Sequence, residues 1–302
     1  MRVTLIHNPK AGDDTRPERK ELIELVESVG HSVSYVSRRD KDWADALDER
    51  ADLIAIAGGD GTVVKVARKM LGRRVPLAVL PAGTANNIAR SIGIADMPFD
   101  QLVAGWASAQ PVSFDAGLAK GPWGSRHFIE GLGIGLFASI MAKPAVNRKL
   151  KRIDDTDEKI DRVLELLADE AHDAPAMPIS ATLDGEDISG RYILFAVMNM
   201  PFVGPNLHLA PSGQPGDGKF DVVLVTEDER EALREYLSCG QECKLQPPRL
   251  PSHSGRRVTI EWTGFELHID DWAWPKGRDV AAASNSIDVK IESNCLQFLV
   301  PA

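Results

Sequence analysis

Residues 53–62 decide the fold, and they read LIAIAGGDGT. The first five form a continuous apolar run, which is typical of a strand that is buried on both faces of a sheet. The glycine-rich half ends that strand, and the apolar spacing after it predicts a helix that runs on to Leu71. A buried strand that turns through glycines into a helix is the repeating unit of a parallel α/β sheet.

The segments on either side repeat this alternation of strand and helix patterns. Further elements are expected at residues 3–7, 16–29, 31–37, 43–47 and 75–80. Gly30 follows the last turn of the helix at 16–29, a position that glycine commonly fills. We therefore predict an open, parallel α/β domain over residues 1–110.

Beyond residue 110 the pattern changes to short β-like segments that are separated by turn residues. They lie at 112–119, 178–184, 190–199, 219–226, 256–261, 265–269, 286–292 and 295–300. Such a series favours an antiparallel sandwich or barrel. We predict a β-sandwich domain over residues 111–302, with helices at 153–171 and 228–238 and with its last residues packing back on the first domain.

Composition excludes several classes of protein. A length of 302 residues suggests about two domains. The net charge of −9 argues against a nucleic-acid partner, because binding phosphates requires a basic face. No apolar run is long enough to span a bilayer, and the three cysteines are too few for a disulfide framework. These features predict a cytoplasmic protein.

Three loops that follow the predicted strands carry the residue types that bind phosphate. They are residues 8–12, 58–62 and 83–86. Parallel strands end at one edge of a sheet, where glycines let the backbone approach an anion and helix N-termini offer N–H groups. Thr62 and Thr84 add hydroxyl donors, and Asp60 suits a Mg²⁺ ion between itself and the phosphates. Neither a P-loop pattern nor a dinucleotide-binding pattern is present.

These loops resemble those of the diacylglycerol kinase catalytic family, in the style of its soluble bacterial lipid kinases and of the sphingosine kinases. The matching segments are NPKAG at 8–12, GGDGT at 58–62, LPAGTANNIAR at 80–90, DAGL at 115–118, FIEGLGIG at 128–135 and the region 199–222. The resemblance implies an N-terminal nucleotide domain, a C-terminal β-sandwich and an active site in the cleft between them.

The resemblance also implies a nucleotide site and a metal site. The residues assigned to ATP are Asn8, Pro9, Lys10, Ala11, Gly12, Ser37, Gly58, Gly59, Asp60, Gly61, Thr62, Val63, Val64, Thr84 and Asn86. Asp217 would bind Mg²⁺ together with the backbone carbonyls of Gln214 and Lys219, an oxygen set that suits a hard cation. The alternative is that Asp217 and Gly218 form only a turn between strands.

The proton acceptor of the resembled family lies in an Asp-Gly-Glu motif on a late strand. Here the corresponding residues are Asp270, Asp271 and Trp272. Asp270 would take the proton of the attacking lipid hydroxyl. Asp271 is the second choice, because adjacent strand residues point to opposite faces and only one can face the cleft. The alternative is that both are turn carboxylates and that the catalytic group has been lost.

Two further departures concern acids near the phosphates. Lys65 stands where the family often has glutamate, and Asn87 where it prefers aspartate. The expected activity is an ATP- and Mg²⁺-dependent lipid kinase acting on a lipid such as diacylglycerol, phosphatidylglycerol or a sphingoid base. An NAD kinase-like enzyme and a catalytically weakened nucleotide- or lipid-binding relative remain as alternatives.

The expected partner is the lipid substrate, with transient contact to the inner face of a membrane. Basic residues that would meet anionic headgroups are Lys143, Arg148, Lys149, Lys151 and Arg152; a solvated face is the alternative. Trp272 and Trp274 are either an interfacial anchor or the edge of a packed core. A homodimer is left open.

Overall fold

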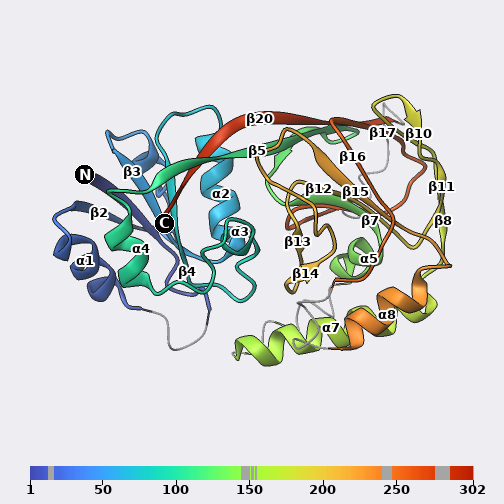
Figure 1. Ribbon diagram of the computed structural model, residues 1–302, viewed down its shortest axis with the longest axis horizontal. Helices are drawn as coiled ribbons and strands as arrows, with labels where there is room; N and C mark the ends of the chain where they lie inside the picture. Colours follow the sequence, from blue (N-terminus) through green and yellow to red (C-terminus); the bar gives the residue numbers. More distant parts are fainter. Residues whose placement is uncertain are drawn as a thin grey trace. The chain divides into compact units, whose positions relative to one another are not determined.

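The computed structural model describes residues 1–12, 17–143, 150, 153, 155–239, 247–275 and 286–301 (Figure 1). The chain divides into two compact units, Met1–Asp115 with Ser293–Ala302, and Ala116–Glu292. We call them unit 1 and unit 2. Strands β5 (Gln110–Gly121) and β20 (Ser286–Val300) carry the chain from one unit to the other.

Unit 1 is built on parallel strands. Its sheet runs in the order β20, β4 (Leu77–Pro81), β3 (Leu53–Gly58), β1 (Arg2–His7) and β2 (Ser32–Ser37). Every residue of β3 is buried, as its apolar run predicts. The helices are α1 (Arg19–Ser28), α2 (Asp60–Met70), α3 (Asn87–Ser91) and α4 (Phe99–Gly105), with a 3₁₀ turn at Asp45–Leu47. The predicted parallel α/β class is confirmed.

Unit 2 is mainly antiparallel, as predicted. One sheet has the order β16 (Ser252–Gly255), β15 (Phe220–Val225), β12 (Leu194–Met198), β7 (Gly131–Gly135), β18 (Leu267–Ile269) and β19 (Trp272–Trp274). A second contains β10 (Glu186–Asp187), β9 (Ala181–Leu183), β17 (Arg257–Glu261) and the first part of β20. Shorter strands are β6 (Gly124–Phe128), β8 (Met177–Ile179), β11 (Gly190–Tyr192), β13 (Phe202–Val203) and β14 (Leu207–His208).

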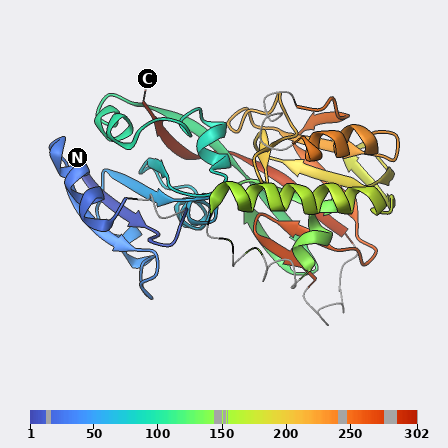
Figure 2. The same ribbon diagram turned by 90° about the horizontal axis from the view of Figure 1, so that it is seen from below.

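Alternation along the strands gives unit 2 two cores. In β12, Phe195 and Val197 join the core that also contains residues of β9, β17 and β20. The intervening Leu194, Ala196 and Met198 join a separate core with helices α5 (Leu136–Ala142), α7 (Thr156–Asp173) and α8 (Arg230–Ser238). Helices α7 and α8 pack side by side over this second core (Figures 1 and 2).

The sequence patterns missed the central strand β7. Its sequence, GLGIG, has glycine at every second position, and glycine is unfavourable in strand interiors. The reason is steric, since a Cβ on Gly133 would lie 2.3 Å from Nε2 of His268 on the neighbouring strand. The two strands expected at 286–292 and 295–300 are a single strand, β20. Cys239 is disulfide-bonded, which the sparse cysteines did not predict.

Candidate active site

The three glycine loops of unit 1 meet at the carboxyl edge of its sheet. Asn8 Nδ2 donates a hydrogen bond of 3.1 Å to Oγ1 of Thr62, which joins the first loop to the second. Gly59 and Gly83 lie so close that a Cβ on Gly83 would be 2.2 Å from the Gly59 Cα. Only glycine permits this approach, because a Cβ on either residue would collide with the other loop. The second and third loops are therefore in direct contact.

Asp60 fastens the second loop to the third. Its Oδ2 accepts the backbone N–H of Asn87 at 3.0 Å, and its Oδ1 accepts that of Ile88 at 2.9 Å. The carboxylate therefore caps the start of α3 while belonging to the first turn of α2. Burial raises the pKa of the Asp60 carboxyl, and the backbone N–H donors act in the opposite direction. The expectation that Asp60 also serves Mg²⁺ stays a prediction.

Asn86 shapes the third loop from within. Its Oδ1 accepts the N–H of Gly83 at 2.9 Å, and its Nδ2 donates to the Gly83 carbonyl at 2.9 Å. Its backbone is left-handed, with φ of 53°, a conformation that asparagine tolerates better than most residues. Thr84 lies half-buried in the same loop. The side chain of Asn86 thus sets the loop conformation, and the main chain is what the loop offers to a ligand.

The first loop has its own hydrogen bonds. The Asn8 N–H donates to the Ala57 carbonyl at 2.9 Å, and its Oδ1 accepts the Lys10 N–H at 3.3 Å. A Cβ on Gly12 would lie 2.6 Å from the Ala82 carbonyl oxygen, so this loop also abuts the third. Pro9 and Ala11 lie between these anchors.

Other predicted nucleotide residues lie at or beside this edge in different roles. Ser37 ends β2 opposite His7, and its Oγ accepts the Arg39 N–H at 3.2 Å. Val63 and Val64 are almost fully buried in α2, so their side chains serve packing. Gly58 precedes α2, and Gly61 has open space around its Cα.

The acidic pair of unit 2 forms the turn between β18 and β19. Asp271 is exposed, whereas Asp270 is buried and has a positive φ of 48°. The strand alternation invoked from the sequence does not apply, because both are turn residues. One carboxylate is nevertheless buried and the other exposed.

Main-chain donors surround the Asp270 carboxylate. Its Oδ1 accepts the N–H groups of Glu130 at 2.9 Å and Gly131 at 3.2 Å, and its Oδ2 accepts that of Ile129 at 3.1 Å. Hydrogen bonds of this kind stabilise the ionised carboxylate and fix its position. The donors are about 140 residues away in sequence, so no local motif could have revealed them.

Trp272, which stands at the glutamate position of the resembled motif, packs against other side chains. Its ring meets Trp123 edge-to-face at a centroid distance of 5.9 Å, and the Arg126 guanidinium lies 4.6 Å from its centroid. Trp274 is buried in the sandwich core. Both tryptophans therefore form a packed core edge.

His268 supports the Asp270 turn from behind. Its Nδ1 lies 3.1 Å from the Asp270 carbonyl oxygen, which can only accept, so Nδ1 carries the proton. Burial lowers the pKa of His268 to about 4, with the hydrogen bond to Asp270 acting against this. The histidine is thus neutral at physiological pH. Sequence patterns could not single it out, because an alternating strand pattern does not show which polar residue is buried.

The predicted metal residues lie in a turn before β15. Asp217 accepts the Lys219 N–H at 2.9 Å, and its own N–H donates to the Gln214 carbonyl at 3.2 Å. Asp221 is a second carboxylate near this turn, and burial together with the charge of Asp217 raises its pKa to about 6. Two mutually repelling carboxylates beside carbonyl oxygens fit a hard cation. Within the described residues, side chains alone do not form a three-ligand metal cluster.

Comparison with known proteins accounts for both units. Residues 2–119 match the model of the diacylglycerol kinase catalytic domain, and residues 145–272 match that of the YegS C-terminal NAD kinase beta sandwich-like domain. Residues 2–119 therefore resemble the catalytic domain of diacylglycerol kinases, and residues 145–272 resemble the domain that follows it in YegS-like proteins. These matches and the similar proteins below support a lipid kinase. Across the described parts of the chain, no helix has the length and apolar character needed to cross a bilayer.

Several similar proteins match most of the length of this chain. A diacylglycerol kinase of Mycobacterium tuberculosis is 23% identical over 276 residues, covering 89% of this chain and 84% of the relative. One of Bacillus subtilis is 27% identical over 254 residues, covering 78% and 76%. The crystal structure of a diacylglycerol kinase from Bacillus anthracis superposes with a TM-score of 0.73 at 18% identity, covering 99% of this chain and 96% of that one. This last match shows a shared fold.

Proposed function

We propose that this chain transfers the γ-phosphoryl group of ATP to a free hydroxyl of a lipid such as diacylglycerol, phosphatidylglycerol or a sphingoid base. The observation that carries the proposal is the contact among the three glycine loops at one edge of the unit 1 sheet. Loops held this close by glycines leave room for a phosphate chain against the main chain, next to the first turn of α2.

Unit 1 would bind the nucleotide. The first loop, residues 8–12, and the start of α2 would meet the phosphates through main-chain N–H groups and the Lys10 ammonium. Oγ1 of Thr62 accepts a hydrogen bond from the Asn8 side-chain amide, so the Thr62 hydroxyl can donate its own proton to an acceptor on the ligand. Lys65 is exposed on α2 and would add a positive charge where the family has an acid.

Unit 2 would supply the acid that orients the acceptor. In the proposed step the lipid hydroxyl oxygen forms a bond to the γ-phosphorus, the bond from that phosphorus to the bridging oxygen breaks, and ADP leaves. The hydroxyl proton passes to the Asp270 carboxylate. Three main-chain N–H donors hold this carboxylate in a fixed position, and phosphoryl transfer depends mostly on positioning and charge stabilisation.

A bound Mg²⁺ would neutralise phosphate charge or hold the turn before β15 in place. Asp217, with the carbonyls of Gln214 and Lys219, would hold the structural ion, and Asp221 adds a carboxylate to that set. Both carboxylate oxygens of Asp60 accept N–H groups at the start of α3. Any contact of Asp60 with a phosphate-bound ion would come in addition to these two hydrogen bonds.

A lipid acceptor requires access to a bilayer, so we propose transient contact with the inner face of a membrane by a cytoplasmic enzyme. Most of the basic residues considered for this contact lie outside the described residues. Lys143 is described, and it forms an ion pair with Glu170.

The direct test is a phosphorylation assay with Mg²⁺ and γ-labelled ATP in mixed micelles. The panel contains diacylglycerol, phosphatidylglycerol, ceramide and a sphingoid base, with NAD⁺ as a separate acceptor. We expect label in at least one lipid and none in NADP⁺. Label only in NADP⁺ would favour the NAD kinase-like alternative. Calorimetric ATP binding without transfer to any acceptor would favour a catalytically weakened relative.

A further inference from the structure

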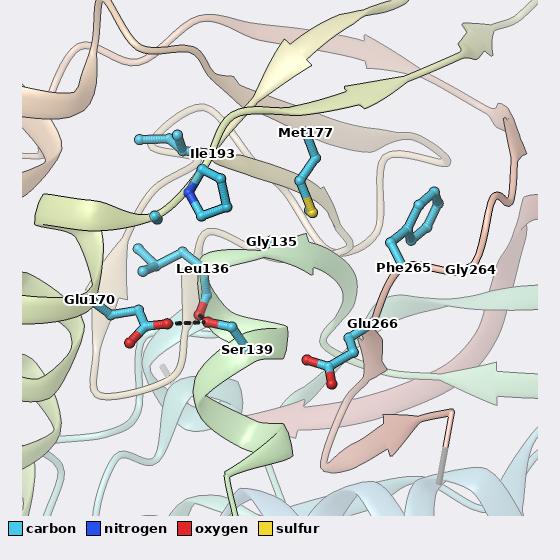
Figure 3. Close-up of a pocket in the computed structure, with 11 residues that line it drawn as sticks. Gly135, Leu136, Ser139, Glu170, Met177, Ile193, Gly264, Phe265 and Glu266 are labelled. Carbon is cyan, nitrogen blue, oxygen red and sulfur yellow. Dashed lines mark hydrogen bonds between the residues drawn. The ribbon is translucent and has the colours of Figure 1, made fainter. Parts of the chain in front are cut away.

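Unit 2 contains a pocket that the proposed phosphoryl transfer does not use. Its volume is about 280 Å³, at the lower end of the range for small-molecule sites (Figure 3). The walls come from the end of β7, the start of α5, the end of α7, strand β8, the residue between β11 and β12, and the loop before β18. The lining residues are Gly135, Leu136, Ser139, Glu170, Ala174, Pro175, Met177, Ile193, Gly264, Phe265 and Glu266.

Most of the pocket wall is apolar. Leu136 and Ile193 are buried, and Met177 and Phe265 are half-buried. Gly135 keeps the floor close to β12, because a Cβ there would lie 2.3 Å from the Ile193 carbonyl oxygen. Such a wall stabilises a bound hydrocarbon group and does not stabilise a fully polar ligand.

The polar side chains of the pocket gather along one side. Figure 3 shows Ser139 between Glu170 and Glu266, with Ile193 and Met177 on the other side. Ser139 Oγ lies 2.9 Å from the Leu136 carbonyl oxygen and 3.0 Å from Oε1 of Glu170. The single hydroxyl proton is shared between these two acceptors.

This polar edge consists of hydrogen-bond acceptors. Glu170 is a carboxylate that pairs with Lys143, and Glu266 is an exposed carboxylate. Among the described residues that line the pocket, the only side-chain donor is the Ser139 hydroxyl, whose proton is already directed to an acceptor. A ligand must therefore bring its own donors, and a positive charge is favoured over a negative one.

We propose that this pocket binds a single-chain amphiphilic amine, with the alkyl chain against Leu136, Met177 and Phe265 and the ammonium group at Glu266 and Ser139. Strand β18 separates Glu266 from Asp270 by four residues, or about 13 Å at the usual rise of a strand. The amine therefore binds apart from the hydroxyl that Asp270 would orient, as a ligand additional to the acceptor lipid.

The test is calorimetric titration of the full chain, without nucleotide, using octylammonium, octyl sulfate and 1-octanol as probes. We expect octylammonium to bind at least tenfold more tightly than octyl sulfate, with 1-octanol in between. Because no phosphoryl transfer is measured, failure of this proposal is independent of failure of the lipid kinase proposal.

Three variants locate the site. Glu266→Gln should weaken octylammonium binding about fivefold and leave 1-octanol unchanged, because it removes only the charge. Phe265→Ala should weaken all three probes about threefold by removing part of the apolar wall. Glu261→Gln removes the charge of an exposed residue that does not line the pocket, so it should leave the binding of all three probes unchanged. Equal binding of octyl sulfate and octylammonium, or unchanged octylammonium binding in Glu266→Gln, would overturn the proposal.

Discussion

In the proposed function, the glycine loops of unit 1 and the acidic turn of unit 2 use main-chain N–H groups for opposite purposes. In unit 1 the loops meet through glycines, and the backbones of Gly59 and Gly83 lie in direct contact. In unit 2 the N–H groups of residues 129–131 converge on the Asp270 carboxylate that the protein itself supplies. Under the proposed function, the first region receives the anion of a ligand, whereas the second already holds the anion of its own Asp270.

Asp60 stands between these two cases. It belongs to the loop region of unit 1, yet its carboxylate is bound by two N–H groups of α3, much as Asp270 is bound by its own donors. An acid of this kind fixes geometry first, and any role in chemistry follows from where it holds its neighbours. We therefore expect substitutions in the unit 1 loops to act through the fit of the backbone. Substitutions in the acidic turn of unit 2 should act through charge and protonation.

The largest expected effect comes from a side chain that forces the unit 1 loops apart. Gly83→Ala places a Cβ 2.2 Å from the Gly59 Cα, so the loops must separate. We expect loss of ATP binding and destabilisation of about 3 kcal/mol, measured by calorimetry and by denaturant unfolding. Gly61→Ala, whose Cβ meets nothing within 4 Å, serves as the stability control and should stay within about 1 kcal/mol of wild type. Equal destabilisation by the two changes would contradict the close-contact account.

The second effect tests protonation behind the Asp270 turn. The pKa of His268 is about 4 in the folded chain, below its ordinary value of 6.5, so the unfolded chain binds the proton more readily between these values. The contribution of His268 to stability is present above pH 6.5 and is lost as the pH falls toward 4. The expected loss is roughly 3 kcal/mol.

Urea unfolding from pH 4 to pH 7 measures this loss. His268→Asn should flatten the slope of the unfolding free energy against pH. The asparagine amide can still donate a hydrogen bond to the Asp270 carbonyl. His253→Gln, which alters an exposed histidine, should leave the slope as it is. A slope that survives in His268→Asn would assign the proton uptake to another group.

The smallest effect concerns the turn before β15. The pKa of Asp221 is raised to about 6, so its contribution to stability is present below pH 4 and is lost as the pH rises through 6. Asp221→Asn should therefore stabilise the chain at pH 7.5, by no more than about 1 kcal/mol because the group is only half-buried.

Mg²⁺ should act on the same turn. If Asp217 and Asp221 share a cation, millimolar Mg²⁺ will raise the melting temperature of the wild type and have little effect on Asp217→Asn. Asp228→Asn, an exposed change elsewhere in unit 2, provides the control. The same Mg²⁺-induced shift in all three proteins would place the ion elsewhere.

The fold of unit 1 was predictable because its information is local. Each apolar run, glycine loop and helix start occupies consecutive residues, so the pattern alone places the three loops at one edge of the sheet. Even here the sequence did not show that Asp60 caps α3, since that contact joins residues about 27 positions apart.

Unit 2 was predictable in class and less so in detail. The glycines of β7 disguised a central strand, because a Cβ on each would collide with atoms far away in sequence, such as His268 at Gly133. The donors to Asp270 and the burial that raises the pKa of Asp221 are likewise tertiary features. The pocket beside α5 was also invisible, since elements far apart in the sequence form its walls.

The most direct measurement compares kcat for lipid phosphorylation in wild type, Asp270→Asn and Asp271→Asn, with melting temperatures taken on the same samples. We predict a decrease of about a hundredfold or more in Asp270→Asn, with KM for ATP unchanged, and a change of less than about twofold in Asp271→Asn. Full kcat in a folded Asp270→Asn protein would contradict the account.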